Sequence, residues 1–90
     1  MKLLNHAKAG TLESGDVFIT VTPGEELLIR LDSPVKQQFG DAIMDLVRKV
    51  LEEQEVTSGT IELSDQGALD CTIRARLMTA LERASKGDVS

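Results

Sequence analysis

Aromatic residues are almost missing from this sequence, and positive charge is scarce. Two phenylalanines stand without tryptophan or tyrosine among 90 residues, so the chain lacks the aromatic platforms on which nucleic-acid bases stack. Fifteen Asp and Glu outnumber ten Lys and Arg, and the formal net charge of −5 has the wrong sign for neutralising phosphates along DNA or RNA. We therefore expect no nucleic-acid partner.

Cysteine is limited to Cys71, which has no partner for an internal disulfide. A reducing cytoplasm is the compartment that this usage favours. The first residues contain too few apolar side chains for a signal peptide, and no apolar run approaches the roughly 18 residues of a membrane span. We expect a cytoplasmic protein without a membrane partner, in which Cys71 is either a small residue against the core or a residue at a helix flank, rather than a reactive thiol.

Residues for catalysis are equally few. His6 is the only histidine, and the sequence contains no metalloprotease motif, paired cysteines, P-loop or GxGxxG. Asp41 and Asp45 fall on the polar face of a predicted helix, where charges are usually solvated. Arg74 and Arg76 are two positions apart and point to different sides of a helix, so they do not form a ready clamp for one anion. We predict no catalytic residue and no metal site.

The length and composition predict one domain, residues 1–90. A chain of this size buries one core, and its 41% hydrophobic and 28% charged residues are ordinary globular values. The two ends of the chain, residues 1–5 and 86–90, are expected to be mobile.

Period-two alternation predicts strands in the first third of the chain. It is clearest over residues 17–22, weaker over 7–12, and returns over 26–31. Ser14-Gly15 stands where a tight hairpin would reverse the chain, and Pro23-Gly24 suits a type II turn. Three consecutive antiparallel strands are the simplest interpretation.

The period then changes to that of helices. Ser33 suits an N-cap and Pro34 a first helical position, and an amphipathic helix of about five turns follows. A short strand is predicted over residues 60–63, and a second helix after a turn at 65–67. The first apolar stripe is Val35, Phe39, Ala42, Ile43, Leu46, Val47, Val50 and Leu51, and the second is Leu69, Ile73, Leu77, Ala80, Leu81 and Ala84.

The predicted order βββαβα has one apolar face on each element. The expected fold is α+β: two layers, with a mostly antiparallel sheet of about four strands and two helices packed on one face. If the third and fourth strands are parallel, the long helix is the crossover between them.

Ser14 is the residue whose position is most favourable for a functional role. Serine beside glycine is common in turns without any further role. A hydroxyl at a hairpin tip is nevertheless accessible to another enzyme, and the neighbouring Gly15 has no side chain to block a bulky group.

Three blocks of sequence carry a family resemblance. They are GTLESGDV at residues 10–17, KQQFGDAI at 36–43, and GALDC at 67–71 with RARL at 74–77. In this order and in a chain of this length, they resemble the citrate lyase acyl carrier proteins, the gamma subunits of that enzyme.

The resemblance implies that Ser14 carries 2'-(5''-phosphoribosyl)-3'-dephospho-CoA through a phosphodiester, with Gly15 leaving room for its approach. It implies a carrier without catalysis of its own. A separate transferase installs the group, whose thiol is then acetylated. The alpha subunit, an acyl transferase, exchanges acetyl for citrate, and the beta subunit, a citryl lyase, releases oxaloacetate. The reactive thiol would come from this prosthetic group, which serves as a flexible arm, so Cys71 need not react.

Rival interpretations remain open at this point. The acyl carrier subunit of malonate decarboxylase uses the same kind of prosthetic group. A module for non-covalent interaction or regulation, with Ser14 a simple turn residue, is a second alternative. A small enzyme that uses Asp41, Asp45 or Arg74 is the most remote.

Overall fold

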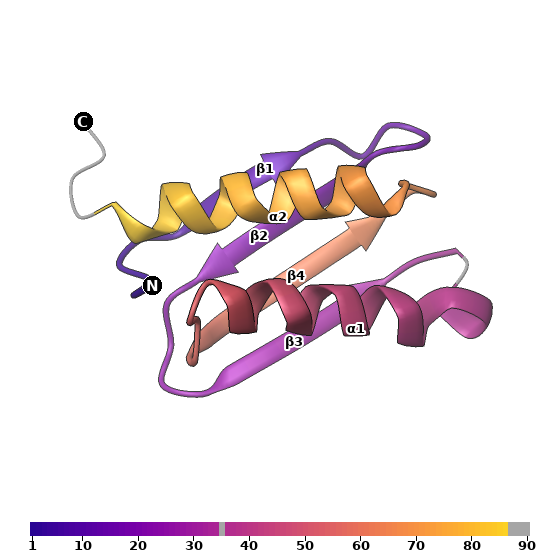
Figure 1. Ribbon diagram of the computed structural model, residues 1–90. Helices are drawn as coiled ribbons and strands as arrows, with labels where there is room; N and C mark the ends of the chain where they lie inside the picture. The colour runs from indigo at the N-terminus through magenta and orange to yellow at the C-terminus, as the bar shows by residue number, and fades with distance from the viewer. Residues whose placement is uncertain (35, 87–90) are drawn as a thin grey trace.

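The computed structural model describes residues 1–34 and 36–86 and contains two layers (Figure 1). Both helices lie on one face of a four-stranded sheet, α2 over β1 and β2 and α1 beside β3. The predicted α+β class and βββαβα order are confirmed. The elements are β1 Ala7–Gly10, β2 Val17–Thr22, β3 Leu27–Asp32, α1 Lys36–Glu53, β4 Gly59–Asp65 and α2 Asp70–Ser85.

The strand order is β1-β2-β4-β3. β2 pairs antiparallel with both β1 and β4, whereas β3 and β4 are parallel and joined by α1. The sheet is therefore mostly antiparallel, as predicted, and α1 is the crossover between the two parallel strands.

The prediction of three consecutive antiparallel neighbours was wrong at the third strand, because β4 lies between β2 and β3. Ile61 and Leu63 of β4 are buried, and a central position pairs both edges of this apolar strand. Residues 23–26 form no tight turn; they cross the end of β4, where the Gly59 N–H donates to the Glu26 carbonyl at 2.9 Å. The four residues between β2 and β3 are thus long enough to pass over one intervening strand, β4.

The core lies between the sheet and the helices. Val17, Ile19 and Val21 of β2 are fully buried, so the predicted inward face of this strand is confirmed. Most of the two predicted helical stripes is buried as well. The buried helical residues are Ile43, Val47, Val50, Leu51, Ile73, Leu77, Ala80, Leu81 and Ala84.

Three members of those stripes are exposed instead: Phe39, Ala42 and Leu69. Phe39 and Ala42 lie in the first two turns of α1, beyond the main core, and Leu69 precedes the first residue of α2. Val35, the remaining stripe residue at this end, lies outside the described residues, as does part of the helix start that Ser33 and Pro34 were predicted to form. Helical periodicity therefore identified the buried face but not where along each helix burial begins.

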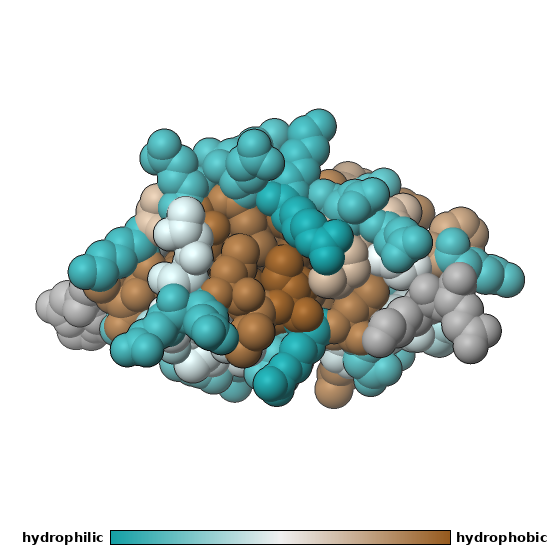
Figure 2. Space-filling view, turned by 90° about the horizontal axis from the view of Figure 1, so that it is seen from below, coloured by the Kyte–Doolittle hydropathy of each residue, from teal (hydrophilic) through white to brown (hydrophobic). Residues whose placement is uncertain are grey.

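β1 and β3 form the two edges of the sheet. Arg83 of α2 covers part of the β1 edge, donating from Nη1 to the Lys8 carbonyl at 2.9 Å. On β3, Leu27 and Leu28 are exposed. Figure 2 shows apolar side chains gathered in the middle of the lower face, where β3 and α1 lie. The outer edge of β3 therefore exposes apolar side chains.

The first residues of the chain pack against the end of α2. Leu3 is part of the core, and the N–H groups of Leu4 and Asn5 both donate to the Ala84 carbonyl. His6 Nδ1 lies 3.2 Å from Thr22 Oγ1. The predicted mobility of residues 1–5 and 86–90 stays a prediction, and residues 87–90 lie outside the described part of the chain.

Candidate functional site

Ser14 lies at the tip of the β1–β2 connection, residues 11–16. The Asp16 N–H donates to the Glu13 carbonyl at 3.0 Å, which closes a four-residue turn around Ser14 and Gly15. Gly15 has φ +84°, as the third position of a type II turn requires. The reversal predicted at Ser14-Gly15 is confirmed, although the connection is longer than a tight hairpin because β1 ends at Gly10 rather than continuing to residue 12.

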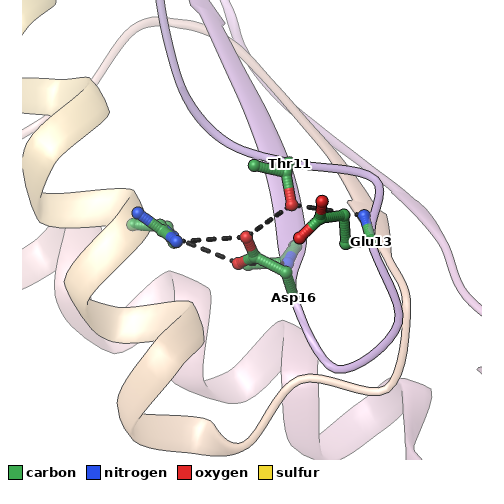
Figure 3. A network of polar contacts seen from close by, with 5 residues as sticks. Thr11, Glu13 and Asp16 are labelled. Carbon is green, nitrogen blue, oxygen red and sulfur yellow. Dashed lines mark hydrogen bonds and ion pairs between the residues drawn. The ribbon is translucent and has the colours of Figure 1, made fainter.

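Asp16 anchors this turn to helix α2 (Figure 3). Its two carboxylate oxygens accept hydrogen bonds from Nε and Nη2 of Arg76, each at 3.1 Å. Thr11 donates to Asp16 Oδ2 at 2.7 Å, and the Val17 N–H donates to Oδ1 at 2.8 Å. A bidentate arginine pair with two further donors fixes the carboxylate in one geometry. The residue two positions after Ser14 is therefore tied to a helix.

These contacts lower the pKa of Asp16 from 3.8 to about 2. The hydrogen bond from Thr11 contributes most, followed by the bonds from Arg76 and the Val17 N–H. All of them favour the charged carboxylate, so folding and ionisation of Asp16 are linked.

The linkage predicts a pH-dependent stability. A lowered folded pKa stabilises the protein above pH 3.8, and the contribution is lost as pH falls from there through about 2. In urea unfolding followed by circular dichroism, wild-type protein should exceed Asp16→Asn in stability by a constant margin from pH 5 to 7. The margin should narrow between pH 4 and 2. Asp45→Asn, at an exposed helix position, serves as control, and a margin that is equal at pH 6 and 2.5 would contradict the linkage.

The segment between β4 and α2 supports the turn from the other side. The Gly15 N–H donates to the Gln66 carbonyl at 2.7 Å, and the Gln66 N–H donates to the Asp16 carbonyl at 2.9 Å. Nearby, Asp65 is buried and accepts hydrogen bonds from the Ala68 N–H at 2.9 Å and the Ser33 hydroxyl at 2.8 Å. Backbone bonds thus join the tip of the connection to the end of the central strand.

The side chain of Ser14 itself points to no partner that the structure describes. It is exposed, and no residue within 1–34 or 36–86 forms a hydrogen bond or ion pair with its hydroxyl. A Cβ atom built on Gly15 would have no described heavy atom within 4 Å. The site therefore combines an accessible hydroxyl with open space on a fixed backbone.

The other candidates from the sequence are not brought together. Asp45 pairs at 3.7 Å with Arg48 and Arg74 with Glu53, both on the surface. Cys71 is exposed in the first turn of α2. In the described part of the chain, no cluster of His, Cys, Asp or Glu is suited to a metal ion, and no described helix is long and apolar enough to cross a membrane.

Sequence reasoning missed the pairing of Asp16 with Arg76. The residues are 60 positions apart, and the pair depends on how α2 docks on the sheet. Asp16 was visible only as part of the block that holds Ser14. The expectation that Arg74 and Arg76 do not converge on one anion is confirmed, since each binds a different carboxylate.

Known proteins resemble this chain over most of its length. A family model described as an acyl carrier protein, the malonate decarboxylase delta subunit (MdcD), matches residues 4–84. The citrate lyase acyl carrier protein of Streptococcus pyogenes serotype M4 is 46% identical over 90 residues, which cover 98% of this chain and 88% of the relative. That of Streptococcus equi subsp. equi is 46% identical over 87 residues, covering 94% and 85%. The chain belongs to the citrate lyase acyl carrier protein family.

Membership makes this protein a carrier subunit without catalysis of its own. The resemblance carried by the three sequence blocks is therefore confirmed. A solved structure, that of a Pseudomonas malonate decarboxylase hetero-tetramer in complex with malonate, contains a chain similar to this carrier in fold. Its TM-score is 0.81 at 24% identity, with 91% of this carrier and 86% of that chain covered.

Proposed function

We propose that the carrier holds 2'-(5''-phosphoribosyl)-3'-dephospho-CoA on the hydroxyl of Ser14, through a phosphodiester, and serves a citrate lyase complex. The observation that supports this most is the unpartnered, exposed hydroxyl on a turn held by Asp16 and Gln66. The open space beside Gly15 fits a bulky phosphodiester substituent. The family assignment supplies the kind of group.

The chemistry of attachment divides between the carrier and a transferase. The oxygen of Ser14 forms the new bond to phosphorus, its proton passes to a base, and a leaving phosphate departs from an activated phosphoanhydride donor. No described side chain of the carrier forms a hydrogen bond with the hydroxyl, so we assign the base and the donor site to the transferase. The carrier contributes an accessible nucleophile in a fixed position.

Once attached, the group supplies a terminal thiol on which acetyl and citryl units are carried. Alpha and beta subunits are the partners that we propose for the loaded carrier, in the cytoplasm. Tethering keeps the thiol at an effective concentration on the order of millimolar near both active sites. The carrier's own part is to hold the point of attachment still, through the bonds of Asp16 and Gly15.

Mass spectrometry tests the attachment. Carrier isolated from cells that make the whole lyase system should show a nucleotide-containing mass increase, and peptide mapping should locate it at Ser14. Ser14→Ala should lack the adduct, whereas Ser58→Ala, at the opposite end of the sheet, should keep it. An unmodified wild-type carrier from such cells would favour the alternative of a non-covalent interaction or regulatory module.

The acyl carrier subunit of malonate decarboxylase remains a second candidate, because the matching family model bears that description. The 46% identity to citrate lyase carriers favours citrate lyase. Loaded carrier mixed with each purified set of partner subunits separates the two: citrate cleavage supports the first, and malonate decarboxylation the second.

A further inference from the structure

Two exposed apolar side chains flank a groove at the end of the molecule that holds Ser14. Phe39 is 54% exposed and Leu69 71% exposed. Between them lies a groove of about 500 Å³, whose lining also includes Ala42, Ile43 and Ala68. Figure 1 shows the starts of α1 and α2 at the same end of the sheet as the β1–β2 connection. The groove and the attachment serine therefore share one end of the fold.

Leu69 is a costly residue for the carrier by itself. It is the N-cap residue of α2, with φ −71° and ψ 157° and no side-chain hydrogen bond to the helix. Leucine is among the poorest N-cap residues, and serine or asparagine among the best. Because its side chain is 71% exposed, it also gains little from burial within the carrier. Neither packing nor capping within the carrier explains a leucine here, whereas contact with a partner would.

The groove adjoins the segment that supports the Ser14 turn. The Gln66 carbonyl accepts the Gly15 N–H at 2.7 Å, and Gly67, the next residue, lines the groove. An enzyme that forms a bond at the Ser14 oxygen must enclose the turn and will contact the residues beside it. Two apolar features lie at this end of the fold: Leu12, which is 62% exposed within the β1–β2 connection itself, and the groove.

The acidic side chains at this end of the carrier would suit an enzyme with basic groups on its docking surface. Glu13 precedes Ser14 and Asp70 lines the groove; neither forms an ion pair with any residue that the structure describes. Arg74 and Arg76 are already bound to carboxylates. The prosthetic-group transferase must hold an anionic, phosphate-rich donor against Ser14 and so needs basic groups there. The same basic groups complement Glu13 and Asp70.

We propose that the groove between Phe39 and Leu69 is the docking site of the transferase that modifies Ser14, with an apolar side chain of that enzyme in the groove and basic side chains facing Glu13 and Asp70. This inference rests on the proposed function. The transferase would bind this groove on the unmodified carrier, before the prosthetic group is attached to Ser14.

The test compares wild-type carrier with Leu69→Ser. Carrier is incubated below saturation with purified transferase and its nucleotide donor, and the adduct is followed over time by intact mass. Removing one leucine from an interface should lower kcat/KM for loading by roughly tenfold or more, mainly through KM. Serine caps α2 better than leucine does, so the thermal midpoint of the variant should equal or exceed that of wild type. Slower loading of the Leu69→Ser carrier, with a thermal midpoint at least equal to that of wild type, would support docking of the transferase in the groove.

Matched variants make the result specific. Leu28→Ser removes a partly exposed leucine from β3 and should load at the wild-type rate, Leu69→Met should keep most of the rate, and Phe39→Ser should lower it. Equal loading of wild type and Leu69→Ser would overturn the inference and leave the proposed function standing. Equal loading followed by slower citrate cleavage would also overturn it, giving the groove to the later subunits. No adduct on wild-type carrier would overturn both.

Discussion

Citrate cleavage is expected to vanish when the lyase complex is assembled with Ser14→Ala carrier. Alanine removes the only atom of residue 14 that can form the phosphodiester, so the complex lacks its arm and should be no faster than alpha and beta subunits alone. The Ser14 hydroxyl has no described partner within the fold, so the substitution should change the free energy of unfolding by less than about 0.5 kcal/mol. The measurement is oxaloacetate release from citrate, beside urea unfolding of the isolated carrier.

Ser58→Ala is the matched control for this experiment. Ser58 precedes β4 at the end of the sheet away from Ser14. A complex with this variant should retain full activity. Full activity of the Ser14→Ala complex would place the thiol chemistry elsewhere and remove the basis of the proposed function.

Gly10→Ala is expected to destabilise the carrier by roughly 2–5 kcal/mol, a large part of the stability of a small domain. Gly10 has φ +90°, and a Cβ built there would lie 1.8 Å from the Val17 carbonyl oxygen. The new methyl group must push the end of β1 away from the start of β2. Both the backbone conformation and the missing space therefore oppose any side chain.

Gly67→Ala separates these two causes. Gly67 has φ +86°, but no described heavy atom would lie within 4 Å of its Cβ. This variant should lose only the conformational part, about 1–2 kcal/mol. Urea unfolding of both variants at neutral pH gives the comparison, and equal losses would argue against the close approach at Gly10.

The class and element order of the fold were accessible from the sequence because periodicity is local. Val17, Ile19 and Val21 alternate with more exposed residues, and Ile73 and Leu77 recur at helical spacing. The order of strands could not be predicted, because the residues at 23–26 suit a tight turn as well as a wider connection. The choice between them depends on β4, which pairs with strands on both sides, and this pairing appears only in the assembled sheet.

The site divides in the same way. The position of Ser14 in a turn follows from its neighbours, above all Gly15, whereas the role proposed for it came from family resemblance and not from local chemistry. The bonds that hold the turn come from Arg76 and Gln66, more than 50 residues further along the chain. Exposure of Phe39 and Leu69 was missed because both satisfy helical spacing; a poor N-cap residue at Leu69 was the available signal.

The pairing of Asp16 with Arg76 also bears on how freely a group attached at Ser14 would move. A phosphodiester at Ser14 would place a negative charge two residues from Asp16, and an unoccupied guanidinium there would grip it in a bidentate pair. Because Arg76 already holds the Asp16 carboxylate with both Nε and Nη2, its guanidinium would not be free to bind that phosphate. Under the proposed function, this pair would leave the attached group unbound on a rigid turn, as a carrier serving two active sites would require.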